Sequence, residues 1–317
     1  MAAEPYRRTY KTVLAFAVIY FVWGSTYLAI RIGVHEVPPF LLAAMRFTVA
    51  GVALYAWAVM RGERSPSARE WFSASLLAIL IFVIDYGLVF WSEQRVPSGL
   101  AAVMMSLNAA FMALAEIAIL RTQKLTSRLV FALTLGVAGV AVLVSRTLHL
   151  GGAPIDTMGA VALLVASIGW SISSSVTRKL PLPSSKIMSS GAQMLVGGVM
   201  LFAMAAALGE FRGFHPQQVS RAAWFALLYL IVAGSIVAFT AYVWLIHHES
   251  PTRVGTYAYV NPVVAVLLGY FFAGEPLGMR TILGSAFVLV SVVVITTTPA
   301  RRTAASLPVD ELETTSD

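Results

Sequence analysis

Long apolar runs separated by short polar segments fill almost the whole chain. A helix that crosses a membrane needs about 20 mostly apolar residues, because the helix rises only about 1.5 Å per residue. The segments between the runs are short and rich in Pro, Gly and Ser, as is typical of turns. The pattern therefore predicts an all-α integral membrane protein with ten transmembrane helices. These cover residues 12–33, 40–60, 71–92, 98–120, 127–146, 157–179, 186–207, 222–247, 252–273 and 280–298.

Composition supports a membrane protein. Of the 317 residues, 58% are hydrophobic and 12% are charged, whereas soluble domains carry about 25% charged residues. The absence of cysteine excludes disulfides and thiolate metal sites. His247 and His248 are adjacent, so on a helix their side chains point about 100° apart. We expect no metal, no cofactor and no nucleic acid, and we expect the lipid bilayer as the surroundings of the chain.

Basic residues indicate how the helices are oriented. Loops on the cytoplasmic side of a membrane are enriched in Lys and Arg. If the N-terminus is cytoplasmic, the cytoplasmic segments 1–11, 61–70, 121–128, 178–186, 248–256 and 301–302 hold 15 of the 22 Lys and Arg. This asymmetry and the even number of helices predict that both termini are cytoplasmic.

The chain also repeats itself. VPSGLAAVMMSLNAAFMALAEIAILRTQKL at 96–125 resembles SPTRVGTYAYVNPVVAVLLGYFFAGEPL at 250–277, and WGSTYLAIR at 23–31 resembles WSISSSVTR at 170–178. The repeats are five helices each, over residues 1–150 and 151–300. Because five is odd, the second repeat is inverted in the membrane, a feature of many secondary transporters. Residues 301–317 are polar and are predicted to form a disordered cytoplasmic tail.

The same stretches resemble a known family. WGSTY at 23–27, PPFLLAAMRF at 38–47, VPSGLAAVM at 96–104 and YVNPVVAVLLGYFFAGEPLGMRTILGSAFVLV at 259–290 resemble the ten-span EamA-type members of the drug/metabolite transporter superfamily. The resemblance covers about residues 12–298. It implies a monomeric or dimeric secondary transporter in a bacterial-type inner membrane. Such a protein exports small metabolites, amino acids foremost, by alternating access. Asn108 departs from the pattern, because the family often has proline there, as at Pro262.

Rings and hydroxyl groups on helices one, three, four, six, eight and nine are the candidate substrate contacts, because such side chains suit amphipathic metabolites. That choice of helices is implied by the resemblance. The alternative for these residues is packing or a belt at the membrane interface. Pro262 is a candidate hinge, or a kink that neighbouring helices satisfy. The candidates are Trp23, Thr26, Tyr27, Tyr86, Phe90, Asn108, Trp170, Ser174, Tyr242, Tyr257 and Asn261.

Two charged residues lie inside predicted helices. Arg46 and Asp85 are about six and seven residues from the same ends of adjacent helices, which places both at a depth of about 10 Å. Charges inside membranes are costly and are usually paired or functional. The hypothesis is an ion pair between them in at least one state, or a coupling role for Asp85.

Two other classes of protein stay open at this point. A membrane enzyme that acts on lipid or peptide needs His, Asp or Glu at catalytic spacing, and the five histidines lie mostly at helix ends or in loops. A channel needs rings of charge or of carbonyl groups. There is no P-loop sequence for ATP. The sequence therefore favours a carrier over an enzyme.

Overall fold

The computed structural model describes residues 3–115, 117–118, 125–145, 156–177, 179–248 and 256–296. Within these ranges the chain forms helices and no strand, so the predicted all-α class is confirmed. The proposed tail at 301–317 lies outside the described residues. The N-terminal half contains α1 Ala3–Val34, α2 Pro39–Met60, α3 Ala68–Ala78, η1 Ile79–Tyr86, α4 Gly87–Ser92, α5 Ser98–Met105, α6 Asn108–Ala115 and α7 Ser127–Val144. The C-terminal half contains α8 Thr157–Thr177, α9 Lys186–Ala207, η3 Pro216–Gln218, α10 Arg221–Tyr229, η4 Leu230–Val237, α11 Ala238–His248, α13 Tyr257–Ala273 and α14 Met279–Thr296.

Many of these helices are apolar enough to cross a membrane. In the described residues, seven are also long enough, and three shorter apolar helices match the predicted fifth, ninth and tenth spans. The protein is therefore a multi-pass membrane protein. The seven are Tyr10–Val34, Pro39–Met60, Ala68–Ser92, Ser98–Ala115, Thr157–Thr177, Lys186–Ala207 and Arg221–Tyr242. The shorter three are Ser127–Leu143, Val260–Ala273 and Met279–Ile295.

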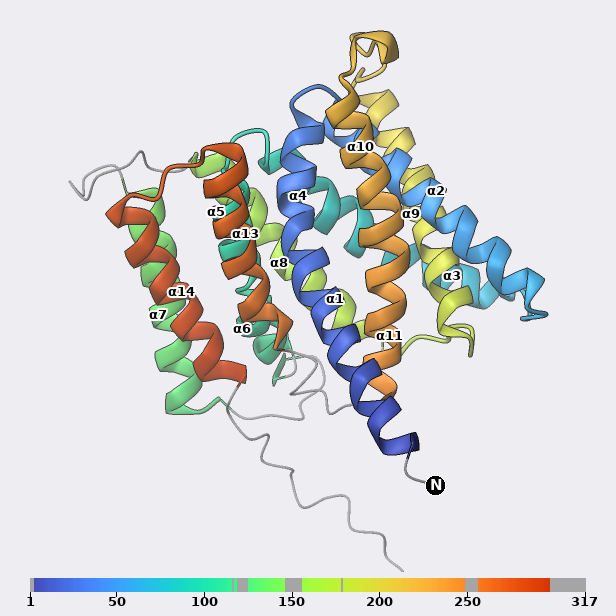
Figure 1. The fold of residues 1–317 in the computed structure, drawn as a ribbon, viewed down its shortest axis with the longest axis horizontal. Helices are drawn as coiled ribbons and strands as arrows, with labels where there is room; N and C mark the ends of the chain where they lie inside the picture. Colours follow the sequence, from blue (N-terminus) through green and yellow to red (C-terminus); the bar gives the residue numbers. More distant parts are fainter. Residues whose placement is uncertain are drawn as a thin grey trace, which may run out of the picture.

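The two halves of the chain interleave. α7 and α14 pack together on one flank, and α2 and α9 pack together on the opposite flank (Figure 1). Between the flanks, α1 packs on α11 and α13 of the other half, while α8 packs on η1 and α6. Every one of these contacts joins a helix of the first half to a helix of the second. The centre of the molecule is thus lined by helices from both halves.

The polar loops gather at two ends of the bundle. The loops 35–38, 93–97, 208–220 and 274–278 lie at the end opposite the N-terminus, which we call the distal end (Figure 1). The loop 61–67 lies at the other end, which we call the proximal end. Because each helix reverses the chain direction, loops from both halves meet at the distal end.

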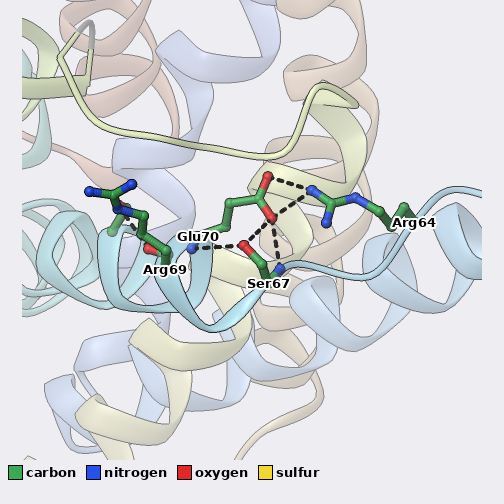
Figure 2. A network of polar contacts seen from close by, with 5 residues as sticks. Arg64, Ser67, Arg69 and Glu70 are labelled. Carbon is green, nitrogen blue, oxygen red and sulfur yellow. Dashed lines mark hydrogen bonds and ion pairs between the residues drawn. The ribbon is translucent and has the colours of Figure 1, made fainter.

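Local sequence fixes where the helices begin. Pro38 and Pro39 start α2, since proline suits the first turn of a helix. Ser67 starts α3 as part of a capping box, in which its hydroxyl accepts from the Glu70 backbone N–H (Figure 2). The Glu70 carboxylate accepts in return from the Ser67 backbone at 2.7 Å and from Arg64 at 2.8 Å. Gly274, with φ 64°, ends α13 in the left-handed conformation.

The predicted fourth span is not one continuous helix. It stops at Met105 and resumes as α6 at Asn108. The Ser106 hydroxyl donates to the Val103 carbonyl at 2.6 Å, a local bond that competes with the regular helix ladder. The predicted span is found over Ser98–Ala115 in the described residues, and the break at Ser106 and Leu107 is a feature that the apolar pattern did not show.

Two other spans contain wide turns. The segments η1 and η4 are π-helical, are of eight residues each, and occupy similar places in the third and eighth spans. Such turns are frequent at functional sites because they displace side chains and carbonyl groups from the regular ladder. Neither segment was predicted, since the apolar pattern of a π-turn resembles that of an α-helix.

Glycines let α2 and α9 approach closely. A Cβ placed on Gly51 would lie 2.5 Å from the backbone nitrogen of Leu195, and one on Gly191 would lie 2.6 Å from the backbone nitrogen of Tyr55. Small residues of this kind allow backbones in membranes to pack against each other. The α2–α9 flank is thus a close contact between the backbones of the two halves.

Candidate functional site

Three aromatic rings from three helices form a first cluster. The ring centroid of Trp23 on α1 lies 5.2 Å from that of Tyr242 on α11 and 5.2 Å from that of Tyr257 on α13. Tyr242 and Tyr257 are 6.2 Å apart, edge to face. The Trp23 indole N–H donates to the Gly234 carbonyl of η4 at 3.3 Å. All three rings were predicted site residues, and the structure brings them together.

A second cluster forms around Tyr86 of η1. Its ring centroid lies 4.7 Å from that of Phe47 and 6.4 Å from that of Trp170 on α8. The Arg46 guanidinium lies over three of the rings, at 4.8 Å from Phe47, 5.3 Å from Tyr86 and 5.9 Å from Phe90. A guanidinium on the faces of aromatic rings is attracted by their electrons. This arrangement holds a cation in the interior without a salt bridge to any carboxylate of the described ranges.

The two clusters meet at η4. The Arg46 Nε donates to the Ser235 hydroxyl at 2.9 Å, and Ser235 follows Gly234, the acceptor of the Trp23 indole. A Cβ placed on Gly234 would lie 3.0 Å from Thr26 and 3.2 Å from a guanidinium nitrogen of Arg46. Because Gly234 has no side chain, α1, α2 and η4 can approach each other closely at this point. Sequence reasoning missed both η4 residues, because small residues in an apolar span carry no visible chemical signal.

Arg46 and Asp85 do not form an ion pair here. Arg64–Glu70 is the salt bridge that the described residues contain. Arg46 is 2% exposed and Asp85 is 2% exposed, and the Asp85 Oδ1 has no hydrogen-bond partner in the described part of the chain. Arg46 is held instead by the rings and by Ser235. The pairing of the two residues in another state stays a prediction.

Two asparagines present buried oxygens. The side-chain Oδ1 atoms of Asn108 and Asn261 are both buried and have no hydrogen-bond partner among the described residues. Asn108 begins α6 after the break, and its backbone carbonyl accepts from the Ser171 hydroxyl of α8 at 3.3 Å. Asn261 precedes Pro262, through which α13 passes as one helix. The role of Pro262 as a hinge stays a prediction.

The remaining predicted residues lie around these clusters. The hydroxyls of Thr26 and Ser174 donate to carbonyls of their own helices, to Trp23 at 2.6 Å and to Trp170 at 2.9 Å. Tyr27 is half-buried and lies within electrostatic range of Asp85, Tyr86 and Tyr257. The Thr26 and Ser174 hydroxyl protons are thus used within their own helices.

A buried carboxylate that sequence reasoning missed lies just beyond α4. Glu93 is fully buried, and both of its carboxylate oxygens have no hydrogen-bond partner in the described ranges. Burial, and after it the neighbouring Glu275 carboxylate, raise the pKa of Glu93 well above its usual range, while Arg31 and Arg46 oppose that shift. In the sequence, "SEQR" at 92–95 resembles a solvated loop. Only the tertiary structure, in which Glu93 is 0% exposed, shows that this part of the loop is buried.

Three carboxylates join the two halves at the distal end, each by accepting from the N-terminus of a helix. Glu275 accepts from the backbone of Ser98 at 2.6 Å and of Gly99 at 3.0 Å, at the start of α5. Glu210 accepts from Leu41 at 2.8 Å, near the start of α2. Glu36 accepts from the Ser220 backbone at 2.5 Å, at the start of α10. Helix N-termini favour negative charge, so these contacts hold the distal end together.

Comparison with known proteins settles the family. The profile of the EamA-like transporter family matches residues 10–145 and again residues 157–297. The chain belongs to the EamA-like transporter family. It is therefore a membrane transporter, with a small-molecule substrate and a lipid bilayer as its surroundings.

Named relatives agree with this family. The "Uncharacterized inner membrane transporter YedA" of Escherichia coli K12 is 36% identical over 284 residues, which is 89% of either chain. "Protein PecM" of Dickeya dadantii is 24% identical over 86% of this chain and 88% of its own. A solved crystal structure with 22% identity has a TM-score of 0.58 and covers 90% of this chain and 96% of its own. That similarity supports the fold alone.

Proposed function

We propose that this transporter is a secondary carrier for small zwitterionic metabolites, with amino acids as the leading class. The main support for this proposal is a set of buried polar groups that have no hydrogen-bond partner among the described residues. These are Arg46 Nη1, Asp85 Oδ1, Asn108 Oδ1 and Asn261 Oδ1, beside two clusters of aromatic rings. A guanidinium suits a carboxylate, a carboxylate suits an ammonium group, and rings suit an apolar side chain. An α-amino acid carries all three features.

We further propose that the chain is built from two inverted repeats, residues 1–150 and 151–300, and works by alternating access. Support comes from the family profile, which matches twice, and from paired contacts. α1 packs on α13 and α11, as α8 packs on α6 and η1. The π-helical segments η1 and η4 occupy similar places in their halves. In such carriers the substrate site lies between the repeats near the midplane, and rocking exposes it to each side in turn.

Counterflow in proteoliposomes tests the substrate class. Vesicles are loaded with one unlabelled amino acid, and entry of the labelled compound is followed for aromatic, aliphatic, acidic and basic amino acids and for sugars. We expect exchange of at least one amino acid class and none of the sugars. Exchange of sugars alone would refute the proposed class.

A pair of tryptophan variants locates the site. Trp23→Ala removes the ring that contacts Tyr242 and Tyr257, and we expect exchange to fall at least tenfold. Trp224→Ala is the matched control, because Trp224 is 37% exposed on α10, and we expect it to exchange like the unchanged protein. Equal rates in the two variants would remove Trp23 from the site.

We propose that both termini are cytoplasmic in a bacterial-type inner membrane and that the carrier works as an exporter. The excess of Lys and Arg in the proximal loops supports this orientation. Reporter fusions within 61–67 and 208–220 test it, because these loops lie at opposite ends of the bundle (Figure 1). A cytoplasmic reporter should be active in the first loop only, and a periplasmic reporter in the second only.

A further inference from the structure

Glu93 occupies a special place between the central clusters and the distal end. It follows the last residue of α4, and its side chain is 0% exposed. Arg31 at the end of α1 donates to the Glu93 backbone carbonyl and, at 3.4 Å, to the Val96 carbonyl. The Arg31 guanidinium therefore binds the backbone of this loop, while both Glu93 carboxylate oxygens have no hydrogen-bond donor in the described residues.

The charged and titratable groups around Glu93 come from several elements. α1 contributes Arg31 and Tyr27, α2 contributes Arg46, and the loop before α14 contributes Glu275. η1, which precedes α4 in the same span, carries Asp85 and Tyr86. α8 packs on α4 and has no titratable residue over Thr157–Thr177. Glu93 is thus a buried acid with one acidic neighbour, Glu275, and two basic neighbours, Arg31 and Arg46.

The chemistry of such a group is restrictive. Moving a carboxylate from water to a site without hydrogen-bond donors costs far more than moving the neutral acid. A carboxyl in this position is more stable when it holds a proton, because the neutral acid is less costly to bury. The protonated oxygen also becomes an O–H donor. The Gln94 and Arg95 side chains that follow are exposed, so water lies only a short distance along the loop.

We propose that Glu93 is a proton-binding site of the carrier, occupied while the distal end is closed and emptied to water when that end opens. In the closed state the Glu93 carboxyl keeps its O–H bond. When Glu275 leaves the N-terminus of α5, water enters beside Glu93, the O–H bond breaks, and a water molecule accepts the proton. The role in coupling rests on the proposed carrier function, whereas proton binding itself does not.

The arrangement of Glu275 supports this link. Its carboxylate holds Ser98 and Gly99, which lie five and six residues after Glu93 on the same loop and helix. Opening of the distal end must break these bonds, because they join the two halves. The same movement brings the negative charge of Glu275 out of the vicinity of Glu93. The state of one carboxyl is therefore tied to the position of the other.

Infrared spectroscopy tests proton binding without a substrate. A protonated carboxyl has its own carbonyl band, which an ionised carboxylate lacks. The full-length protein in lipid nanodiscs should show this band at pH 7, and glutamate labelled with ¹³C at the δ carbon should shift it. Glu93→Gln should remove it, while Glu70→Gln, whose carboxylate binds Ser67 and Arg64 away from the distal end, should leave it. The proposal is overturned if the wild-type protein shows no such band at pH 7, or if the glutamate label does not shift the band. A band that the label does not shift would favour Asp85.

If Glu93→Gln fails to fold, the labelling arm still uses the unchanged protein and decides whether a glutamate or Asp85 holds the proton, and Glu93→Asp, which keeps the carboxyl but should shift the band, then assigns it to Glu93. Glutamine has the shape and neutrality of the protonated acid, so we expect a normal folded yield. Transport then tests coupling, with the amino acid that exchanges best as the probe. Glu93→Gln should retain exchange without a gradient. Its uptake driven by a pH gradient should fall at least tenfold. An equal loss of both overturns the coupling role. If no amino acid exchanges at all, the proposed function fails while the infrared result still decides proton binding.

Discussion

Glu275 holds the N-terminus of α5 through Ser98. Its carboxylate accepts from the Ser98 backbone at 2.6 Å and from the Ser98 hydroxyl at 2.7 Å, 177 positions away in the sequence. Hydrogen bonds to a charged group contribute about 1.5–3 kcal/mol each. Glu275 is therefore one of the three carboxylates that fasten the two halves of the chain to each other at the distal end.

Removing this charge should open the distal end. In a Glu275→Gln protein that carries Thr26→Cys as its only cysteine, a membrane-impermeant maleimide added to intact cells should label about tenfold faster than in the Thr26→Cys parent. The chain has no cysteine of its own, so the signal has one source. The reason is the loss of the inter-half hydrogen bonds, which shifts the population toward the open state.

Glu70→Gln, placed in the same Thr26→Cys parent, is the matched control for that experiment. Glu70 also accepts from a serine at the start of a helix, but Ser67 and Glu70 are in one half of the chain (Figure 2). Its loss should lower stability by a similar amount without any change in the labelling rate of the introduced thiol. Faster labelling in both variants would mean general loosening and would contradict a role of Glu275 in closing the distal end.

The stabilities of Arg46 and Asp85 variants should be additive. Arg46→Gln removes the ring contacts and the bond to Ser235, and we expect a cost of about 2 kcal/mol. Asp85→Asn should change the melting temperature little, because Asp85 has no ion pair here. Thermal melts of the single and double variants measure the coupling. Recovery of stability in the double variant would show that the two side chains pair in the folded resting state.

Ser235→Ala separates the two contacts of Arg46. This variant removes only the hydrogen bond to Nε, so it should cost about 1 kcal/mol. The difference from Arg46→Gln then measures the contribution of the aromatic rings.

Gly51→Ala should destabilise the α2–α9 contact. The new methyl group would lie 2.5 Å from the Leu195 backbone nitrogen, and a backbone cannot move aside as a side chain can. Overpacking typically costs about 1–3 kcal/mol, which thermal melts in detergent detect. Gly213→Ala is the control, since a Cβ there meets nothing within 4 Å. Equal melting temperatures for the two variants would contradict the close approach of α2 and α9.

Glu36 should make stability sensitive to acid. The Ser220 hydroxyl and then the Ser220 backbone lower the pKa of the Glu36 carboxyl. A carboxyl with a lowered folded-state pKa stabilises the fold above the pKa of the unfolded chain and loses that contribution as the pH falls through the folded value. The difference in melting temperature between wild type and Glu36→Gln should therefore shrink as the pH falls below about 4.3. Glu63→Gln, which removes another exposed glutamate, is the control, and a difference that did not change with pH would contradict this account.

The sequence by itself determined the helices and the membrane. Apolar runs of about 20 residues leave the backbone no partner in lipid other than its own helix. Pro38, Ser67 and Gly274 mark helix ends because their local chemistry acts before any packing. Trp23, Tyr242 and Tyr257, the rings that meet, were among the candidates because rings suit amphipathic metabolites and because the resemblance implied their helices. The role of these residues in transport is a proposal that the experiments above address.

The tertiary structure alone decided the partners of the charged groups. Arg46 was expected beside Asp85 because their depths match, yet depth says nothing about rotation around the helix axis. Packing turned Arg46 toward Phe47, Tyr86 and Ser235. Glu93 resembled a solvated loop residue, yet the fold buries it completely, with Arg31 of α1 and Glu275 of the other half as neighbours. Hydrogen bonds and burial between distant segments depend on which helix faces meet, and one helix's own pattern does not specify that.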